Sequence, residues 1–386
     1  MVVSNSEYSL VPEIANGLTV DFEKPDEAID KVLLATHLYK VLCVIATDDS
    51  VASIAAKLAE SLQLQGNQPN VAELTRRKDL ARQALKTANC RIPDFELHQI
   101  STDSINKPTI RYPIVVKPLS LSGSRGVIRV NNEREFQSAV KRIDKILETT
   151  GIKGEARNKL LLESYLDGDE YAIEGFVING QFCLMTIFDK PEPLTGPFFE
   201  ETYYITPTRL SQSQQDDLIV EVASCCKAYG IIQGPVHAEI RLTPEGPVLL
   251  ELAARTIGGQ CGQLIEFSMG QKLEELVIQG MCGQLPTMKG EKKSAGVLMI
   301  PVTDRGILKR VEGLTDALQV PHIKDIEIHI GEGYPLVPLP EGSSYLGFIF
   351  AQSPSFEETW QALKSAYQEL NFVTSASWQI EAIANR

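Results

Sequence analysis

The chain has 386 residues, of which 43% are hydrophobic and 23% charged, and its formal net charge is −13. This length is more than one hydrophobic core usually serves, so we expect two or three globular domains. The acidic excess argues against a nucleic-acid partner, because phosphate backbones require Lys and Arg. No apolar run approaches the roughly 18 residues that span a bilayer, and no signal peptide is recognised, so no membrane partner is expected. The seven scattered cysteines form no Cys-x-x-Cys motif, which is typical of a protein of the reducing cytoplasm.

Residues 1–75 are expected to form an α/β domain. The stretch "KVLCVIA" (residues 40–46) is a continuous apolar run, typical of a buried parallel strand, and "SVASIAAKLAESLQL" (residues 50–64) has apolar residues at helical spacing. Asp48 and Asp49 lie between them, at the carboxyl end of the predicted strand, where open α/β sheets bind ligands. A helix N-cap is an equally good interpretation of either aspartate.

The remaining elements alternate between helices and strands. Helices are expected over residues 76–95, 133–148, about 211–229 and about 270–283, and strands over 113–117, 159–166 and 235–253. Polarity alternates over residues 169–188 around Asn179-Gly180, a dipeptide typical of a two-residue hairpin turn. From residue 289 onward, antiparallel strands accompany one amphipathic helix over 355–370, which indicates an α+β domain.

A basic residue and a flexible loop follow one buried strand in the stretch "VVKPLSLSGSRGV" (residues 115–127). Glycine-rich loops at strand ends often hold phosphates. This stretch is not the G-x-x-x-x-G-K-[ST] loop, however, because Lys117 precedes the glycines. An exposed strand end followed by a plain hairpin is the alternative.

A hairpin is predicted over residues 237–255. The sequence Thr243-Pro244-Glu245-Gly246 suits a type I turn within a three-residue loop closed by glycine. That register pairs Thr243 with Pro247, and four residues further along each strand it places Glu239 directly opposite Glu251.

The opposed glutamates require an explanation, because like charges facing each other across two strands are destabilising. Mg²⁺ is typically held by one or two carboxylates together with substrate phosphates, so Glu239 and Glu251 are candidate metal ligands. The alternative is a surface ladder in which Arg241 and Arg255 neutralise the two carboxylates.

In their order and spacing, these motifs resemble the ATP-grasp superfamily over residues 78–260. The resemblance implies ATP contacts from two lysines, a phosphate lid, an adenine hinge and a ribose ligand, namely Lys78, Lys117, Ser122, Gly123, Ser124, Gly126, Glu163, Tyr165, Leu166 and Glu170. It further implies that Glu239 and Glu251 bind Mg²⁺, with Mn²⁺ as an alternative, and that Arg255 is catalytic. Substrate contacts are implied for Glu201, His237, Gly258 and Gly259, with His237 interpreted as a structural or contact residue rather than a general base.

The implied fold class is α/β and α+β multidomain. It comprises an N-terminal parallel α/β domain (1–75) that lacks its first strand, an ATP-grasp domain of two α+β subdomains (76–288, with a lid subdomain at about 108–163) and a C-terminal α+β domain (289–386). One departure from the family is Ala253, which stands where a metal-binding Asn is usual and leaves the number of metal ions open.

Within the superfamily, the segment at 188–207 and the C-terminal region resemble L-amino acid ligases. The resemblance implies an ATP-dependent ligase of the cytoplasm that joins a small-molecule carboxylate to an amine, both expected to be amino acids, through an acyl phosphate. A homodimer is expected. The alternatives are a biotin-carboxylase-like or purine-pathway ligase of the same superfamily, and an ATP-binding regulator without catalysis, supported only by Ala253.

Overall fold

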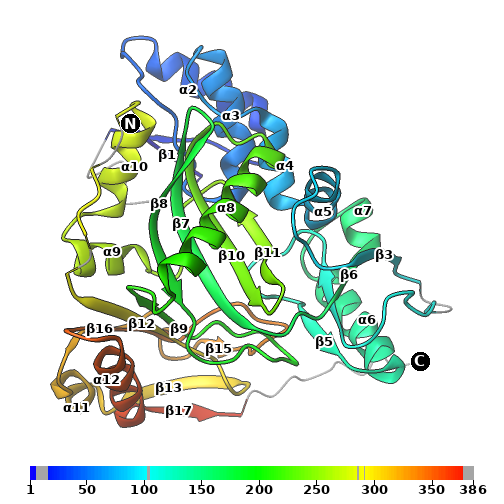
Figure 1. The fold of residues 1–386 in the computed structure, drawn as a ribbon, viewed down its shortest axis with the longest axis vertical. Helices are drawn as coiled ribbons and strands as arrows, with labels where there is room; N and C mark the ends of the chain where they lie inside the picture. Colours follow the sequence, from blue (N-terminus) through cyan, green and yellow to red (C-terminus); the bar gives the residue numbers. More distant parts are fainter. Residues whose placement is uncertain (6–15, 102–104, 285–286, 291, 377–386) are drawn as a thin grey trace.

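The computed structural model describes residues 1–5, 16–101, 105–284, 287–290 and 292–376. In this part of the chain the strands form an eight-stranded, a four-stranded, a three-stranded and a two-stranded sheet. Figure 1 shows the eight-stranded sheet at the centre, with the four-stranded sheet beside it and the N-terminal helices at one end.

The central sheet is antiparallel and has the order β11-β10-β7-β8-β9-β12-β16-β14. Its strands are β7 (Asp169–Ile178), β8 (Gln181–Asp189), β9 (Tyr203–Thr206), β10 (Gln233–Thr243), β11 (Gly246–Ala253), β12 (Ser294–Ile300), β14 (Ile323–Ile328) and β16 (Gly347–Ser353). The pairing of β9 with β12 carries the sheet across the predicted domain boundary near residue 288. Strands of the C-terminal region therefore extend the same sheet that carries the hairpin β10–β11.

Helices cover both faces of this sheet. On one face, α8 (Gln212–Tyr229) packs Leu218 and Val222 against Ile173 of β7. On the other, α9 (Gly262–Met269) and α10 (Leu273–Met281) pack against Phe176. Since side chains alternate along a strand, the even-numbered residues of β7 lie on the face of α9 and α10. Glu170 shares that face with Phe176, and it lies at the end of the strand where the helices leave room for a cavity.

The four-stranded sheet has the order β3 (Phe95–Gln99), β6 (Lys159–Ser164), β4 (Ile114–Pro118), β5 (Ile128–Val130). The helix α6 (Glu133–Glu148) packs Phe136 and Val140 against this sheet, and its first turn is capped by the Asn132 side chain. Burial of Ile114 and Val116 on the helix side turns Lys117, which is next in the alternation, towards the opposite side.

The other elements complete the two ends of the molecule. They are β1 (Val2–Ser4), β2 (Gly17–Thr19), α2 (Pro25–Thr36), a 3₁₀ helix (Asp49–Val51), α3 (Ala52–Ser61), α4 (Pro69–Arg76), α5 (Lys78–Thr87), α7 (Glu155–Asn158), β13 (Gly306–Glu312), α11 (Leu314–Gln319), β15 (Pro335–Leu336), α12 (Phe356–Glu369) and β17 (Asn371–Ser375). Strands β1 and β2 pair in parallel, and α12 packs on β12 and β16.

Two expectations for secondary structure are wrong. Residues 40–46 form no strand, because an apolar run becomes a strand only beside a partner; Val44 and Ile45 instead pack, partly buried, against two cores. The helix expected over 76–95 begins at Lys78 and ends at Thr87, well before Pro93. Asn89 follows in the left-handed region (φ 57°), a conformation that commonly ends helices.

Within the described residues, no helix is long and apolar enough to cross a membrane. The four-stranded sheet begins at Phe95, before the predicted lid, and the last ten residues of the predicted C-terminal domain lie outside the described residues. The division into three domains at residues 75 and 288 stays a prediction.

Candidate active site

A cavity of about 380 Å³ lies where the central and four-stranded sheets meet. It is lined from β4, β6, β7, β10 and β11, and also by Met299 and Tyr345 from the C-terminal region. Of the residues that the sequence predicts for the site, all but one line this cavity: Lys78, Lys117, Ser122, Gly123, Ser124, Glu163, Tyr165, Leu166, Glu170, Glu201, His237, Glu239, Glu251, Arg255, Gly258 and Gly259. The structure therefore brings together side chains from most of the chain's length.

Gly126 is the predicted residue that does not line the cavity. Its N–H donates a hydrogen bond to the Pro340 carbonyl (2.9 Å), and its φ of 73° lies in the left-handed region. A Cβ here would lie 2.7 Å from Cγ of Pro118, so only glycine fits without a shift. The residue shapes the base of the loop at residues 122–126, here called the lid loop after its expected role, instead of facing the cavity.

The structure pairs Glu239 with Glu251 across β10 and β11, as expected, although the turn differs. Thr243 pairs with Gly246, so the loop has two residues rather than three. A register shift beyond Glu239 leaves Leu250 without a partner and restores the expected pairing of the glutamates. The bulge offsets the shorter loop, and both glutamates line the cavity.

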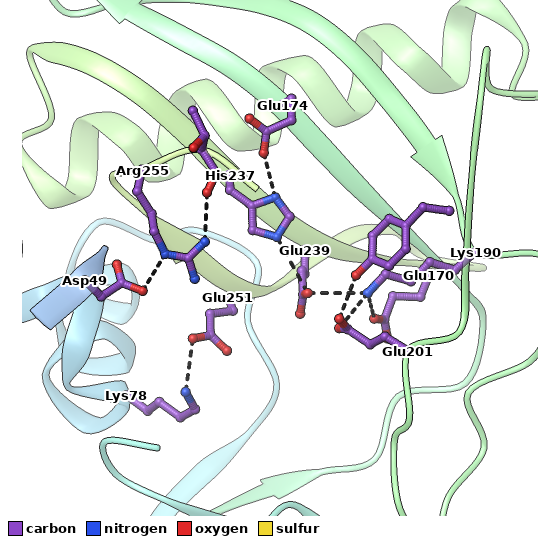
Figure 2. A network of polar contacts seen from close by, with 12 residues as sticks. Asp49, Lys78, Glu170, Glu174, Lys190, Glu201, His237, Glu239, Glu251 and Arg255 are labelled. Carbon is purple, nitrogen blue, oxygen red and sulfur yellow. Dashed lines mark hydrogen bonds and ion pairs between the residues drawn. The ribbon is translucent and has the colours of Figure 1, made fainter. Parts of the chain in front are cut away.

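Both opposed glutamates are held in the ionised form. The Lys78 ammonium lies 3.0 Å from Oε1 of Glu251. Figure 2 shows these two side chains pointing towards each other. Burial acts to raise the pKa of Glu251, but Lys78 and the neighbouring cations lower it. Burial also opposes ionisation of Glu239, yet Lys190 at 3.4 Å and the nearby imidazole of His237 bring its pKa down to about 2. Two ionised carboxylates at one place form a site for cations.

Lys190 lies among three carboxylates and was not identified from the sequence. Its ammonium is 2.7 Å from Glu170, 2.9 Å from Glu201 and 3.4 Å from Glu239, and 3% of its side chain is exposed. Burial alone would lower the pKa of Lys190, but the three carboxylates raise it well above the usual value. The available signal was its place one residue after β8, which pairs with β7 beside Glu170.

Lys117 is held by one buried carboxylate. Glu163 receives Lys117 at 2.6 Å and Arg82 at 2.5 Å, and 1% of the residue is exposed. Burial acts to raise the pKa of Glu163, whereas the two cations lower it to about 2. The Glu163 side chain is thus occupied by ion pairs that orient Lys117 towards the cavity.

Arg255 is held by an aspartate from the N-terminal region. Its Nε donates to Asp49 at 2.6 Å, and Nη1 donates to the Thr256 carbonyl (Figure 2). The neighbouring Asp48 accepts a hydrogen bond from the Ser50 N–H and caps the 3₁₀ helix, although it also lines the cavity. The N-cap interpretation is thus confirmed for Asp48, whereas Asp49 neither caps a helix nor lines the cavity but holds Arg255; binding of a ligand by either aspartate stays a prediction.

His237 bridges two glutamates. Its Nδ1 lies 2.8 Å from Glu174, which is fully buried and was not identified from the sequence, and its Nε2 lies 3.7 Å from Glu239. Burial would lower the pKa of His237, but these two partners raise it to about 9. An imidazole that is protonated at neutral pH cannot accept a proton, which agrees with the interpretation of His237 as a structural or contact residue.

Comparison with known proteins identifies two domain families in the chain. The ATP-grasp domain family matches residues 110–263, and the L-amino acid ligase C-terminal domain 2 matches residues 298–375. The crystal structure of the L-amino acid ligase from Bacillus licheniformis superposes with a TM-score of 0.79 and 29% identity, over 92% of this chain and 86% of that one. The expected mixed α/β multidomain fold is confirmed.

Two relatives of known activity match over most of this chain. Dapdiamide A synthase of Enterobacter agglomerans is 24% identical over 288 residues, which are 71% of this chain and 67% of that protein. Alanine–anticapsin ligase of Bacillus subtilis (strain 168) is 23% identical over 284 residues, which are 68% of this chain but only 58% of that protein.

Proposed function

Because this chain combines an ATP-grasp domain with a C-terminal domain of the L-amino acid ligase type, we propose that it is an ATP-dependent carboxylate–amine ligase. Its substrates would be amino acids, its product an amide or peptide, and its by-products ADP and phosphate. The observation that carries the proposal is the pair of ionised glutamates, Glu239 and Glu251, opposed across one hairpin in the cavity that Lys78 and Lys117 also line.

The acidic pair fits a divalent cation. In the structure each glutamate already has an ammonium group as its neighbour, Lys78 beside Glu251 and Lys190 beside Glu239. Carboxylate oxygens are the ligands that Mg²⁺ prefers, and Glu239 and Glu251 would hold it. When bound, Mg²⁺ supplies positive charge that neutralises nucleotide phosphates. Since Ala253 offers no side-chain ligand, the two glutamates would be the protein ligands of this hairpin.

The nucleotide would lie between the lid loop and the lysines. Gly123 (φ 60°) and Ser124 (φ 53°) both adopt left-handed conformations, and turns of this kind point successive N–H groups towards an anion. Lys78 and Lys117 would place positive charge beside the phosphates, and the backbone at Tyr165 would face the adenine base. The lid, the lysines and this segment all line the one cavity.

The reaction would proceed in two transfers. A carboxylate oxygen of the first substrate attacks the γ-phosphorus of ATP, the bond to the β-phosphate oxygen breaks, and ADP leaves with that electron pair. The neutral amine of the second substrate then attacks the acyl carbon, the bond from that carbon to the phosphate oxygen breaks, phosphate leaves with the electron pair, and the nitrogen gives up one proton to solvent or phosphate. Arg255 would stabilise the negative charge on the acyl phosphate and on the tetrahedral oxyanion.

Amino-acid substrates are supported by the C-terminal region rather than by the ATP site. Its type matches L-amino acid ligases, and its residues Met299 and Tyr345 reach the cavity beside Glu201 and Gly259. The name of one relative, alanine–anticapsin ligase, describes the joining of an amino acid to a second molecule. A carboxylase or purine-pathway ligase would not need a C-terminal domain of this type.

The test is turnover with pairs of amino acids. The purified full chain, ATP and Mg²⁺ are incubated with each pair, ADP and phosphate are measured, and the product is identified by mass spectrometry. Glu251→Gln should abolish ADP release, whereas Glu245→Gln, an exposed change in the turn of the same hairpin, should leave it intact. ATP binding without ADP release for any pair would instead indicate a regulator and contradict the proposal.

A further inference from the structure

A second group of metal-binding residue types lies away from the cavity, between α5 and α8. Ligand atoms of Cys90, Glu221 and Cys225 lie within 4.8 Å of one another. None of the three residues lines the cavity that holds the ATP-grasp motifs. The thiol of Cys225 donates to Glu221 at 3.7 Å, so the donors are in contact and not merely on the same surface.

Two elements present these three donors. Glu221 and Cys225 are four residues apart on α8, which places them on the same face one turn apart. Cys90 follows the end of α5, just after Asn89 turns the chain in the left-handed conformation. The N–H of Arg91 donates to Oε1 of Glu221 at 2.9 Å and fixes the orientation of that carboxylate. The donors are thus positioned by a helix, by a helix end and by a backbone hydrogen bond.

Cys90 and Cys225 interact directly. Their contact lowers the pKa of Cys90, whereas the same contact and burial raise the pKa of Cys225, so a metal ion would have to displace the Cys225 proton. Cys225 is buried, whereas Cys90 and Glu221 are partly exposed, which leaves an entry path from solvent. Thiolate sulfur selects borderline and soft ions such as Zn²⁺, and a carboxylate oxygen is a regular companion ligand.

We propose that Cys90, Glu221 and Cys225 form a binding site for a divalent transition-metal ion of the zinc type. Two sulfurs and one carboxylate oxygen supply three ligands, and water supplies the fourth through the partly exposed side. Binding displaces the proton of each thiol, so occupancy rises with pH. Its three residues do not line the cavity of Glu239 and Glu251, and its ligands are softer, so it does not compete for Mg²⁺.

A bound ion would join α5 to α8. The helix α5 begins with Lys78 and carries Arg82, which holds Glu163 and through it Lys117. The helix α8 packs against β11, the strand of Glu251. A metal bridge at the far end of α5 therefore ties the helix that supplies Lys78 to α8, which packs against the strand of Glu251. The expected result is higher stability of this part of the fold without any direct contact with substrate.

The probe is Co²⁺, because thiolate ligation gives it a charge-transfer absorption band that oxygen ligands alone do not produce. The reduced full chain is titrated with Co²⁺ and then with Zn²⁺, which should displace it. The expected result is one equivalent of ion, with the band lost in Cys90→Ser and in Cys225→Ser and weakened in Glu221→Gln. Zn²⁺ should also raise the Tm of the wild type, and the rise should disappear in Cys90→Ser, a variant of a partly exposed residue that is expected to fold.

The matched control is Cys282→Ser. Like Cys90 and Cys225, Cys282 contacts a second thiol, that of Cys43. Its replacement should leave the absorption band and the stoichiometry of Co²⁺ binding unchanged. The proposal is overturned if no thiolate band appears, or if the band is lost in Cys282→Ser but kept in Cys90→Ser. It is also overturned if Cys90 and Cys225 are found joined as a disulfide and the thiols released by reducing it bind no ion. These readouts do not depend on ligase activity, so they separate this site from the proposed function.

Discussion

The cations of the site fall into two groups that differ in how firmly the protein holds them. Lys78 and Lys117 each contact one carboxylate, and 16% and 13% of their side chains are exposed. Lys190 contacts three carboxylates and is 3% exposed. A lysine with one partner and access to the cavity can exchange that carboxylate for a phosphate. A lysine enclosed by three carboxylates instead fixes their positions. Lys78 and Lys117 are therefore suited to binding a ligand, and Lys190 to holding the side chains of the site in place.

Removing the enclosed lysine should have the largest effect on stability. Lys190→Met removes the cation that Glu170, Glu201 and Glu239 share, and although Glu170 keeps Arg241, breaking a buried ion pair in this way costs about 3–5 kcal/mol. Urea unfolding would measure the loss, and lowering the pH from 7 towards 5 should restore part of it as carboxylates take up protons. The control Lys141→Met changes an exposed lysine of α6. Equal stability of the two variants would refute a structural role for Lys190.

Removing a lysine of the first group should affect catalysis more than folding. In Lys117→Met, Glu163 keeps Arg82, so the expected loss of stability is about 1.5–3 kcal/mol, the value of one charged hydrogen bond. Losing one donor to the phosphates should lower kcat/KM for ATP by about 100-fold or more. Steady-state kinetics of Lys117→Met test this expectation, with Lys145→Met, an exposed change on α6, as the control. A drop in stability as large as that of Lys190→Met would erase the distinction between the groups.

The imidazolium that contacts the same acidic cluster predicts a pH dependence. The folded-state pKa of His237 is about 9, above its usual value of 6.5, so its contribution is complete below about pH 6.5 and disappears as pH rises through 9. Between pH 7 and pH 9 the free energy of unfolding should fall by about 2 kcal/mol on this account. In His237→Gln the decline should be absent. Denaturant unfolding at a series of pH values measures this decline. An equal fall of the unfolding free energy with pH in the wild type and in His237→Gln would contradict a protonated His237.

The smallest effect is expected at the rim of the lid. Arg142 of α6 pairs with Glu341 at 2.6 Å, but both side chains are substantially exposed. Surface ion pairs of this kind contribute about 0–1 kcal/mol, so Glu341→Gln should change stability by less than about 1 kcal/mol. Because the pair joins the lid to the C-terminal region, KM for ATP should rise slightly, by about two-fold or less. Glu332→Gln, a change at an exposed residue, is the control. A large loss of turnover in Glu341→Gln would show that the Arg142–Glu341 pair contributes to catalysis, contrary to this prediction.

Patterns among neighbouring residues predicted the turns and helices that depend mainly on neighbouring residues. The turn at Asn179-Gly180 joins β7 to β8 as expected, and α6 spans the expected residues 133–148. The opposition of Glu239 and Glu251 was also predicted, but from the wrong loop length. A bulge at Leu250 compensated for that error, and a bulge leaves no signature that alternation alone reveals.

The features that escaped prediction depend on partners distant in the sequence. Glu174 faces His237 across two strands, and Lys190 meets Glu239 from a third, so neither contact can be read from spacing along the chain. The expected strand over 40–46 failed for the same reason, since apolar composition does not specify which strand lies alongside. The roles assigned to individual site residues by resemblance stay predictions until they are tested by substitution.

The lid contacts and the continuous sheet limit how this chain can be divided. Gly126 donates to Pro340, and Arg125 donates to the carbonyl of Glu341, a residue 216 positions later. Strand β9 pairs with β12. A fragment ending near residue 288 would lose these anchors of the loop at residues 122–126 and would expose the backbone of β9 as an unpaired edge, a surface prone to intermolecular strand addition. Chimeras that exchange the C-terminal portion between related chains must therefore preserve that strand pairing and residues 340–341, or they will aggregate.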